Sequence, residues 1–317
     1  MQTAALGETG LTVTRLGFGS QTIGGLGYGP QDQSASVPAA LAYLAGGGRL
    51  IDTARGYGTS EIHVGRALRA YGMPSHLVTI CSKSGSTHPP CIAADLETSR
   101  YCLGRDHIDV YYVHVPPADR DALMRVLDAY EDFRRDGRIR FIGLSCKRLD
   151  RPEACEEVRD WIHDGRAQVM QFPYSFARPW VGELIAEARA AGIGCVVRQA
   201  LEGGLLSGAY RPGHRFTDRA NDGRAGVDPA AMAEALELID AIRQRFAVGP
   251  YATLADVSLA YVLSHPDVAA TIPGGGDPEQ VTTNLRADAL PPLSPETRQE
   301  LEAMAAPLVP LTRQGKD

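Results

Sequence analysis

The chain has 317 residues and a mass of 34.0 kDa, which is enough for one large domain or two ordinary ones. Hydrophobic residues make up 44 % and charged residues 22 %, the proportions of a globular protein, so disordered and fibrous classes are excluded. A net charge of −6 gives no electrostatic reason to bind nucleic acid or an acidic membrane.

The first predicted element is a hairpin over residues 3–14. It contains the turn sequence Gly7-Glu8-Thr9-Gly10 between two short runs that mix polar and apolar residues. We expect this hairpin to precede the main sheet and to cover one end of it.

Eight short apolar segments then follow as predicted strands. They are continuous apolar runs rather than strict alternations, which is typical of parallel strands that are buried on both faces. The segments are 16–18, 50–52, 77–80, 108–113, 141–144, 169–172, 194–197 and 268–272.

Helix-length segments lie between these strands. Examples with helical spacing are 60–71, 122–135, 153–163 and 180–191. Strand and helix alternate without a Pro-, Gly- or Ser-rich linker, which favours a single (β/α)8 barrel domain over residues 1–317. The alternative is an open, doubly wound parallel sheet.

Long connections are expected at the active-site face of such a barrel. Residues 209–228 are rich in Arg, Gly and Asp and are predicted to be a loop before a helix that starts near Pro229. Substrate choice should depend on this loop and on 21–30, 84–90 and 115–120, whose sequences identify no particular substrate.

Neither a metal site nor a membrane segment is predicted. The eight histidines show no H-x-H or H-E-x-x-H spacing, and the six cysteines form no C-x-x-C pair. No stretch approaches the roughly 20 apolar residues that span a bilayer. We therefore expect a cytoplasmic protein with free thiols that binds no metal, nucleic acid or membrane.

Four polar residues stand at or just after three successive predicted strands. Asp52 ends the second strand, Tyr57 follows it, Lys83 follows the third strand and His114 ends the fourth. Each alone has an ordinary structural explanation, such as a helix cap or a packed core residue. Neighbouring strand ends lie within several ångströms of one another in a barrel, so together the four residues predict a catalytic group.

These residue types fit the reduction of a carbonyl by hydride transfer. The reaction leaves an alkoxide that needs a proton donor, and Tyr57 can donate. A phenol ordinarily has a pKa near 10, and a neighbouring ammonium favours the phenolate. Lys83 would supply that charge, Asp52 would keep Lys83 charged, and a neutral His114 would orient the carbonyl oxygen.

The sequence also resembles the aldo-keto reductase superfamily over essentially its whole length. The resemblance lies in the following segments: 16–19, 51–54, 57–61, 65–68, 80–83, 103–104, 108–114, 137–145, 171–175, 203–208, 272–274 and 279–281, and in Asn284. It implies a barrel that binds a nicotinamide dinucleotide, normally NADPH, without a Rossmann fold. Consistently, Thr22 stands where the third glycine of a G-x-G-x-x-G fingerprint would be.

The resemblance implies which residues hold that cofactor. Ser145 and Gln171 would contact the nicotinamide amide, the loop from Leu201 to Ser207 the pyrophosphate, and the segment from Pro273 to Asn284 the adenosine. The full set is Gly19, Ser20, Asp52, Ser145, Gln171, Arg198, Leu201, Gly203, Leu205, Ser207, Ile272, Pro273, Gly274, Asp277, Gln280 and Asn284.

One departure from the family pattern concerns the choice between NADPH and NADH. Gly275, Gly276 and Asp277 stand where relatives usually carry a base or serine that grips the 2′-phosphate. A carboxylate there would repel the phosphate and could accept a hydrogen bond from a free ribose hydroxyl. NADH is therefore a candidate cofactor, unless Asp277 only caps a helix and Arg286 or another base helps.

Two further departures lie at the nicotinamide end. Cys146 replaces a common asparagine, and Arg198 stands where many relatives place an aromatic ring. A planar guanidinium can stack on an aromatic face. Arg198 and Arg55 also allow an anionic substrate, although Arg55 could equally pair with a carboxylate.

The sequence therefore predicts an NAD(P)(H)-dependent oxidoreductase that reduces a small carbonyl compound to an alcohol, or performs the reverse reaction. Two alternatives stay open: a nicotinamide-binding regulatory or channel-associated subunit, and an NAD-dependent sugar or polyol dehydrogenase on the same barrel. The sequence does not indicate an oligomeric state.

Overall fold

The computed structural model describes residues 1–28, 32–146, 149–218 and 220–308. Within them, eight parallel strands form one sheet in which each strand pairs with the next along the chain. The strands are β3 (Phe18–Gly19), β4 (Leu50–Asp52), β5 (Thr79–Ser84), β6 (Ile108–Val113), β7 (Ile139–Ser145), β8 (Val169–Pro173), β9 (Gly194–Arg198) and β10 (Ala270–Thr271).

The sheet closes on itself between its first and last strands. Parallel bridges join Leu16 to Thr271 and Gly19 to Gly274, and the Gly17 amide donates to the Thr271 carbonyl at 2.8 Å. Glycine is needed at position 19 because a Cβ there would lie 2.5 Å from the Ile272 carbonyl oxygen. The predicted (β/α)8 barrel is confirmed, and the open sheet is excluded.

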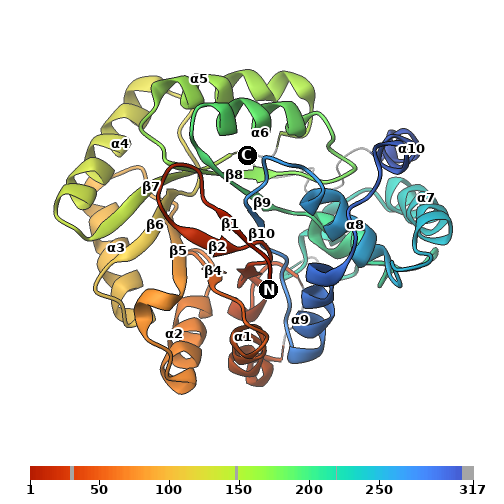
Figure 1. Cartoon of the computed structure of the whole chain (residues 1–317), viewed down its shortest axis with the longest axis horizontal. Coiled ribbons are helices and arrows are strands. Elements are labelled where there is room, and N and C mark those ends of the chain that lie inside the picture. Colours follow the sequence, from red (N-terminus) through yellow and green to blue (C-terminus); the bar gives the residue numbers. More distant parts are fainter. Residues whose placement is uncertain (29–31, 147–148, 219, 309–317) are drawn as a thin grey trace.

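Helices surround the barrel (Figure 1). In α4, apolar residues recur every three or four positions and are buried, and Asp119 caps the helix by accepting from the Ala122 amide at 2.7 Å. The helices are α1 (Ser36–Ala45), α2 (Ser60–Tyr71), α3 (Pro89–Leu103), α4 (Arg120–Arg135), α5 (Glu156–Asp164), α6 (Val181–Ala190), α7 (Pro229–Phe246), α8 (Leu254–Leu263), α9 (Pro278–Leu285) and α10 (Pro295–Ala305).

The predicted N-terminal hairpin is also confirmed, as antiparallel β1 (Thr3–Ala5) and β2 (Thr12–Thr14). It lies across the centre of the barrel in Figure 1. Leu6 and Val13 are fully buried and share one apolar cluster with inward-facing strand residues such as Leu50, Val110 and Val196. The hairpin therefore closes the end of the barrel opposite the carboxyl ends of the strands.

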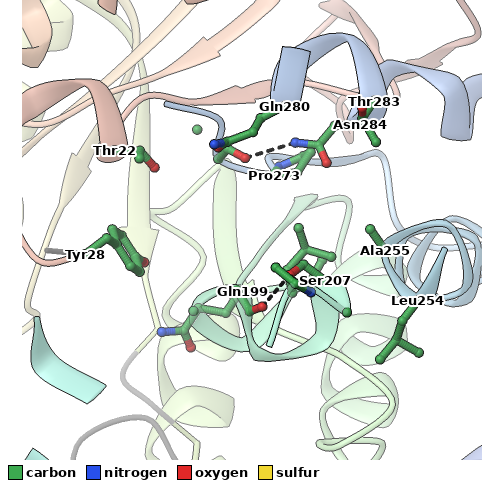
Figure 2. A pocket seen from close by; sticks show the side chains of 18 of the residues that line it. Thr22, Tyr28, Gln199, Ser207, Leu254, Ala255, Pro273, Gln280, Thr283 and Asn284 are labelled. Carbon is green, nitrogen blue, oxygen red and sulfur yellow. Dashed lines mark hydrogen bonds between the residues drawn. The ribbon is translucent and has the colours of Figure 1, made fainter. Parts of the chain in front are cut away.

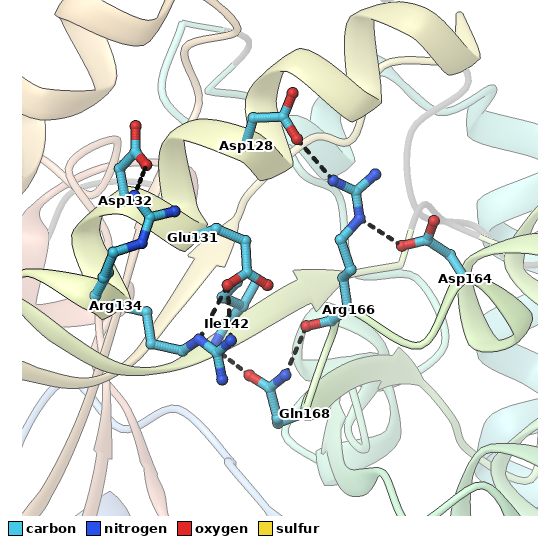
Figure 3. A network of polar contacts seen from close by, with 9 residues as sticks. Asp128, Glu131, Asp132, Arg134, Ile142, Asp164, Arg166 and Gln168 are labelled. Carbon is cyan, nitrogen blue, oxygen red and sulfur yellow. Dashed lines mark hydrogen bonds and ion pairs between the residues drawn. The ribbon is translucent and has the colours of Figure 1, made fainter.

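Polar contacts outside the barrel tie α4 to the segment that leads into β8 (Figure 3). Arg166 forms ion pairs with Asp128 and Asp164, each at 2.9 Å. The Gln168 side chain accepts from the Ile142 amide at 2.9 Å and donates to the Arg166 carbonyl at 2.7 Å. These bonds hold the start of β8 against β7.

Several predicted boundaries differ from the structure. Strand β5 starts at Thr79 and continues to Ser84, so Lys83 lies within the strand rather than after it, paired in register with Tyr112. Leu77 belongs to the preceding turn η3 (Ser75–Leu77). A short turn, η4 (Pro152–Cys155), replaces the first residues of the predicted helix 153–163, because proline begins the turn and α5 starts only after it.

Candidate active site

The alternation of side chains along the strands brings the predicted site residues together. In a strand every second side chain points to the same face, so residues two positions beyond an inward-facing apolar residue also point inward. Four pairs illustrate the pattern, each an apolar interior residue followed by a polar one: Leu50 and Asp52, Cys81 and Lys83, Val169 and Gln171, and Val196 and Arg198. The barrel interior is thus apolar toward the amino ends of the strands and polar at their carboxyl ends.

Lys83 and Asp52 form a buried ion pair at this polar end. Their side chains are 0 % and 2 % exposed, the Lys83 Nζ donates to Asp52 Oδ1, and it also donates to the Thr53 carbonyl at 2.8 Å. Burial disfavours the ammonium, but the Asp52 carboxylate, together with Tyr57 and Cys81, more than offsets burial and raises the pKa of Lys83. The site therefore favours the charged form of a lysine that is fully buried.

Tyr57 and His114 lie against this ammonium. The Lys83 Nζ is 5.1 Å from the centre of the Tyr57 ring, and the Tyr57 and His114 rings meet edge to face at 5.5 Å. Burial, helped by the charges of Lys83 and Arg198, lowers the pKa of His114 to about 3. His114 is therefore neutral at pH 7, as the sequence predicts.

The loop that carries Tyr57 is fixed from behind. The Ser60 hydroxyl donates to the Ser20 carbonyl at 2.9 Å, and the Ser20 hydroxyl donates to the Asp52 carbonyl at 2.7 Å. Gly24 allows a close approach, since a Cβ there would lie 1.8 Å from the Tyr57 carbonyl oxygen. These contacts thus fix the backbone on either side of Tyr57 relative to Asp52.

Gln171 presents an open hydrogen-bond acceptor beside this cluster. Its Nε2 donates to Asp52 Oδ2, whereas its Oε1 is buried and has no partner among the described residues. A buried acceptor without a partner costs free energy, so such atoms in native proteins call for a ligand or a water. The amide of a bound molecule would satisfy it.

A cavity of about 710 Å³ runs from Tyr57 to the start of α9. Figure 2 shows Gln280 and Asn284 on one side of it and Gln199 and Ser207 on the other. The predicted cofactor residues that line it are Gly19, Asp52, Gln171, Arg198, Leu201, Gly203, Ser207, Ile272, Pro273, Gly274, Asp277, Gln280 and Asn284. Its size suits a cofactor-sized ligand.

Three predicted cofactor residues lie outside the cavity lining. Ser20 belongs to the hydrogen-bonded support behind Asp52, and Leu205 packs in the core at 2 % exposure. Ser145 is buried at the end of β7. Their side chains were assigned from motif position alone, which does not distinguish a lining residue from the residue that packs behind it.

The predicted pyrophosphate loop forms the turn η5 (Glu202–Ser207). Gly203 and Gly204 have φ of 62° and 90°, a region that favours glycine, and the Ser207 hydroxyl donates to the Gly204 carbonyl at 2.6 Å. Glu202 is buried and accepts from the Ser175 hydroxyl at 2.6 Å and from Arg178 at 3.0 Å. This anchor fixes the loop to the segment after β8.

At the opposite wall Asp277 caps α9. Its carboxylate accepts from the Gln280 amide at 2.8 Å and from the Gln280 Nε2 at 2.7 Å. Asn284 donates to the Gly274 carbonyl at 2.9 Å. Asp277 therefore caps the helix, as the alternative interpretation expected, and it also lines the cavity. Arg286, the base considered as a helper for the phosphate, is exposed and is not among the lining residues.

Tyr28, Gln199 and Arg224 are among the lining residues that sequence reasoning did not single out. Arg224 donates to the Gly203 carbonyl at 2.9 Å and to the Tyr210 hydroxyl at 2.7 Å, so it ties the loop 209–228 to η5. Gln199 has a φ of 58°, unusual for a residue other than glycine. The Arg-rich composition of the loop was the only sequence signal for Arg224.

The two arginines proposed for an anionic substrate differ in their surroundings. Arg55 pairs with the buried Glu61 at 2.5 Å. Arg198 donates only to the Cys146 carbonyl, at 2.8 Å, and no described carboxylate lies within 4.0 Å of it. Arg55 is thus neutralised within the protein, and Arg198 is not.

The described residues contain neither a candidate metal site nor a candidate membrane span. Across 1–28, 32–146, 149–218 and 220–308, no three His, Cys, Asp or Glu side chains are grouped as a metal site would require. In the same ranges no helix has the length and apolar character needed to cross a membrane. All six cysteines are free thiols, as predicted.

The closed barrel with its cavity at the carboxyl ends of the strands has close structural counterparts. The aldo-keto reductase AKR11C1 from Bacillus halodurans in its holo form superposes with a TM-score of 0.78 at 23 % identity, over 98 % of both chains. The glycerol dehydrogenase AKR11B4 from Gluconobacter oxydans gives a TM-score of 0.77 at 23 % identity, over 99 % of this chain and 97 % of that one.

Sequence comparison identifies the family. A sequence model of the Aldo/keto reductase family matches residues 15–306, and the chain therefore belongs to the aldo/keto reductase family. It is 28 % identical to the NADH-specific methylglyoxal reductase of Escherichia coli (strain K12), over 90 % of this chain and 93 % of that protein. The protein is an oxidoreductase that interconverts carbonyl compounds and alcohols with a nicotinamide dinucleotide.

Proposed function

We propose that Tyr57 is the general acid and base of this oxidoreductase and that Lys83, Asp52 and His114 support it. The observation that carries the proposal is the buried Lys83 ammonium, which is bonded to Asp52 and lies 5.1 Å from the Tyr57 ring. A cation at that position stabilises the phenolate that remains when Tyr57 gives its proton to a developing alkoxide. His114, being neutral, orients the carbonyl oxygen by donating a hydrogen bond.

Gln171 and the cavity walls would hold the cofactor. When bound, the nicotinamide supplies or accepts the hydride. The open Gln171 Oε1 would accept from the carboxamide, and the glycines of η5 would allow the backbone to approach the pyrophosphate. The start of α9 faces the adenosine end of the cavity. Ser145, next to Gln171 in register across β7 and β8, is the second proposed carboxamide residue.

Tyr57→Phe tests this proposal. We expect turnover to fall by at least about a hundredfold with cofactor affinity close to wild type, because only the proton donor is removed. Tyr111→Phe is the control: it also removes a single hydroxyl from a fully buried tyrosine, but Tyr111 belongs to the apolar core outside the barrel interior and does not line the cavity. An active Tyr57→Phe enzyme would remove Tyr57 from the mechanism.

We further propose that NADH binds with an affinity within about tenfold of that for NADPH, the family's usual cofactor. Gly275, Gly276 and Asp277 offer no cation at the start of α9, and Arg243, which lines the cavity, is bonded to Asp240 at 2.9 Å. An arginine contact to a phosphate contributes about 1.5 to 3 kcal/mol, so its absence removes the usual basis for NADPH preference. The relative named an NADH-specific methylglyoxal reductase agrees with this choice.

Fluorescence titration with both cofactors tests the preference. We expect the affinity for NADH to lie within about tenfold of that for NADPH, which corresponds to roughly 1.4 kcal/mol, and Gly276→Arg to shift the preference toward NADPH. A wild-type preference for NADPH beyond about a hundredfold would contradict the proposal and point to Arg243 or Arg211 as the phosphate-binding base.

A further inference from the structure

Arg198 is a cavity-lining cation that forms no ion pair with any carboxylate of the described residues. Its Nη2 donates to the Cys146 carbonyl at 2.8 Å, and its Nε is buried and has no partner among the described residues. Burial lowers the pKa of Arg198, yet a guanidinium stays protonated in proteins. A positive charge therefore faces the cavity beside Tyr57 and Gln171.

The neighbouring charges do not cancel it. Asp52 is already paired with Lys83, and Glu202 with Arg178, each within the described residues. His114 is neutral near pH 7, because burial lowers its pKa to about 3. Whatever binds at this end of the cavity therefore meets a net positive field.

The strand register fixes which part of a bound dinucleotide meets Arg198. Pro173 of β8 pairs with Arg198 of β9, so the side chains of Gln171 and Arg198 rise from neighbouring strands into the same end of the cavity. A carboxamide bound at the Gln171 Oε1 would bring its attached ring to the part of the cavity that Arg198 lines. A planar guanidinium packs on the flat face of such a ring.

We infer that Arg198 makes this site discriminate between the redox states of the cofactor, binding the reduced form more tightly than the oxidised form. The inference rests on the nicotinamide placement proposed above. The oxidised nicotinamide ring carries a positive charge and the reduced ring is neutral, so only the oxidised ring is repelled by Arg198. The pyrophosphate and adenosine are common to both forms and cancel in the ratio of the two dissociation constants.

This discrimination has a consequence for the direction of the reaction. Tighter binding of the reduced form raises the reduction potential of the bound couple, by about 30 mV for each tenfold difference in affinity of a two-electron couple. The bound reduced cofactor is then a weaker hydride donor than the free one. The site is biased toward accepting hydride from an alcohol.

Calorimetric titration of the full chain with NADH and with NAD⁺, without substrate, tests the inference. We expect wild type to bind NADH at least about tenfold more tightly, or roughly 1.4 kcal/mol. Arg198→Gln should bring the two affinities within about threefold of each other, mainly by improving NAD⁺ binding. Arg198→Lys keeps the charge and should preserve most of the difference.

Arg243→Gln is the matched control, since Arg243 lines the same cavity but is paired with Asp240. Arg243→Gln should change the affinities for NADH and NAD⁺ by the same factor, so that their ratio stays as in wild type. An unchanged ratio in Arg198→Gln overturns the inference while leaving Tyr57 and the cofactor assignment intact. Failure of the wild type to bind either form overturns the proposed function as well.

The alternative role for Arg198 is to bind the carboxylate of an anionic substrate. Pyruvate and methylglyoxal form a suitable pair of probes, because one carries a carboxylate where the other carries an aldehyde. If Arg198→Gln left the NADH to NAD⁺ ratio unchanged and raised KM for pyruvate alone, the guanidinium would serve the substrate, and our inference would be wrong.

Discussion

The two ends of the barrel use the same strands for different purposes. At the end covered by the hairpin, Leu6 and Val13 are fully buried against apolar strand residues. At the other end the same alternation presents Lys83, Gln171 and Arg198, and two buried atoms there, Gln171 Oε1 and Arg198 Nε, have no partner among the described residues. The end covered by the hairpin, here called the closed end, contributes stability. The end that carries the cavity, here called the open end, holds charged side chains ready for a ligand, and this lowers stability.

The largest expected effects on stability and turnover come from a substitution at the open end. Lys83→Met leaves the Asp52 carboxylate buried without its partner, and we expect a loss of about 3 to 5 kcal/mol in the free energy of unfolding. Turnover should also fall by at least about a hundredfold, because the charge beside Tyr57 is lost. Denaturant unfolding and steady-state kinetics measure the two effects separately.

The double variant Asp52→Asn with Lys83→Met separates stability from function. Removing both charges should recover most of the lost stability, because no unpaired ion is then buried, while activity stays low. If the double variant were as unstable as Lys83→Met, the ion pair would not be the cause of the loss.

The next largest effect is expected at the closed end. Leu6→Ala removes a fully buried side chain from the interior cluster and should cost about 2 to 5 kcal/mol of stability. The affinity for NADH should stay as in wild type, because the cavity lies at the opposite ends of the strands. A change in that affinity larger than about threefold would mean that the two ends are energetically coupled.

His114 gives the open end a pH-dependent stability. Its pKa is about 3 in the folded protein against an ordinary value of 6.5, so between these values the unfolded chain binds more protons. Stability from this group is complete above pH 6.5 and is lost as the pH falls toward 3. Relative to His114→Asn, wild type should lose at least about 1 kcal/mol between pH 6.5 and 4.5.

The smallest effect is expected on the outer surface near β8. Arg166→Ala breaks the ion pairs to Asp128 and Asp164 but leaves the backbone carbonyl that Gln168 uses. Exposed ion pairs contribute about 0 to 1 kcal/mol, so thermal unfolding should shift little and kinetics should not change. A loss above about 2 kcal/mol would show that this network stabilises the barrel more than its exposure suggests.

The sequence predicted the barrel and the grouping of Asp52, Tyr57, Lys83 and His114 because both depend on periodic patterns. Alternating strands and helices define the topology, and the topology places successive strand ends side by side. The exact limits of β5 were missed, since a strand ends where its hydrogen bonds to β6 end, and that partner is distant in sequence.

Only the tertiary structure decided how individual charges are used. Arg55 had two interpretations, which its ion pair with Glu61 distinguishes, whereas Asp277 both caps α9 through Gln280 and lines the cavity. Whether Arg198 is neutralised depends on every element around the barrel mouth, and no local pattern encodes that. Sequence periodicity specifies which face a side chain occupies, whereas its pairing, burial and pKa depend on long-range neighbours that only the folded chain brings together.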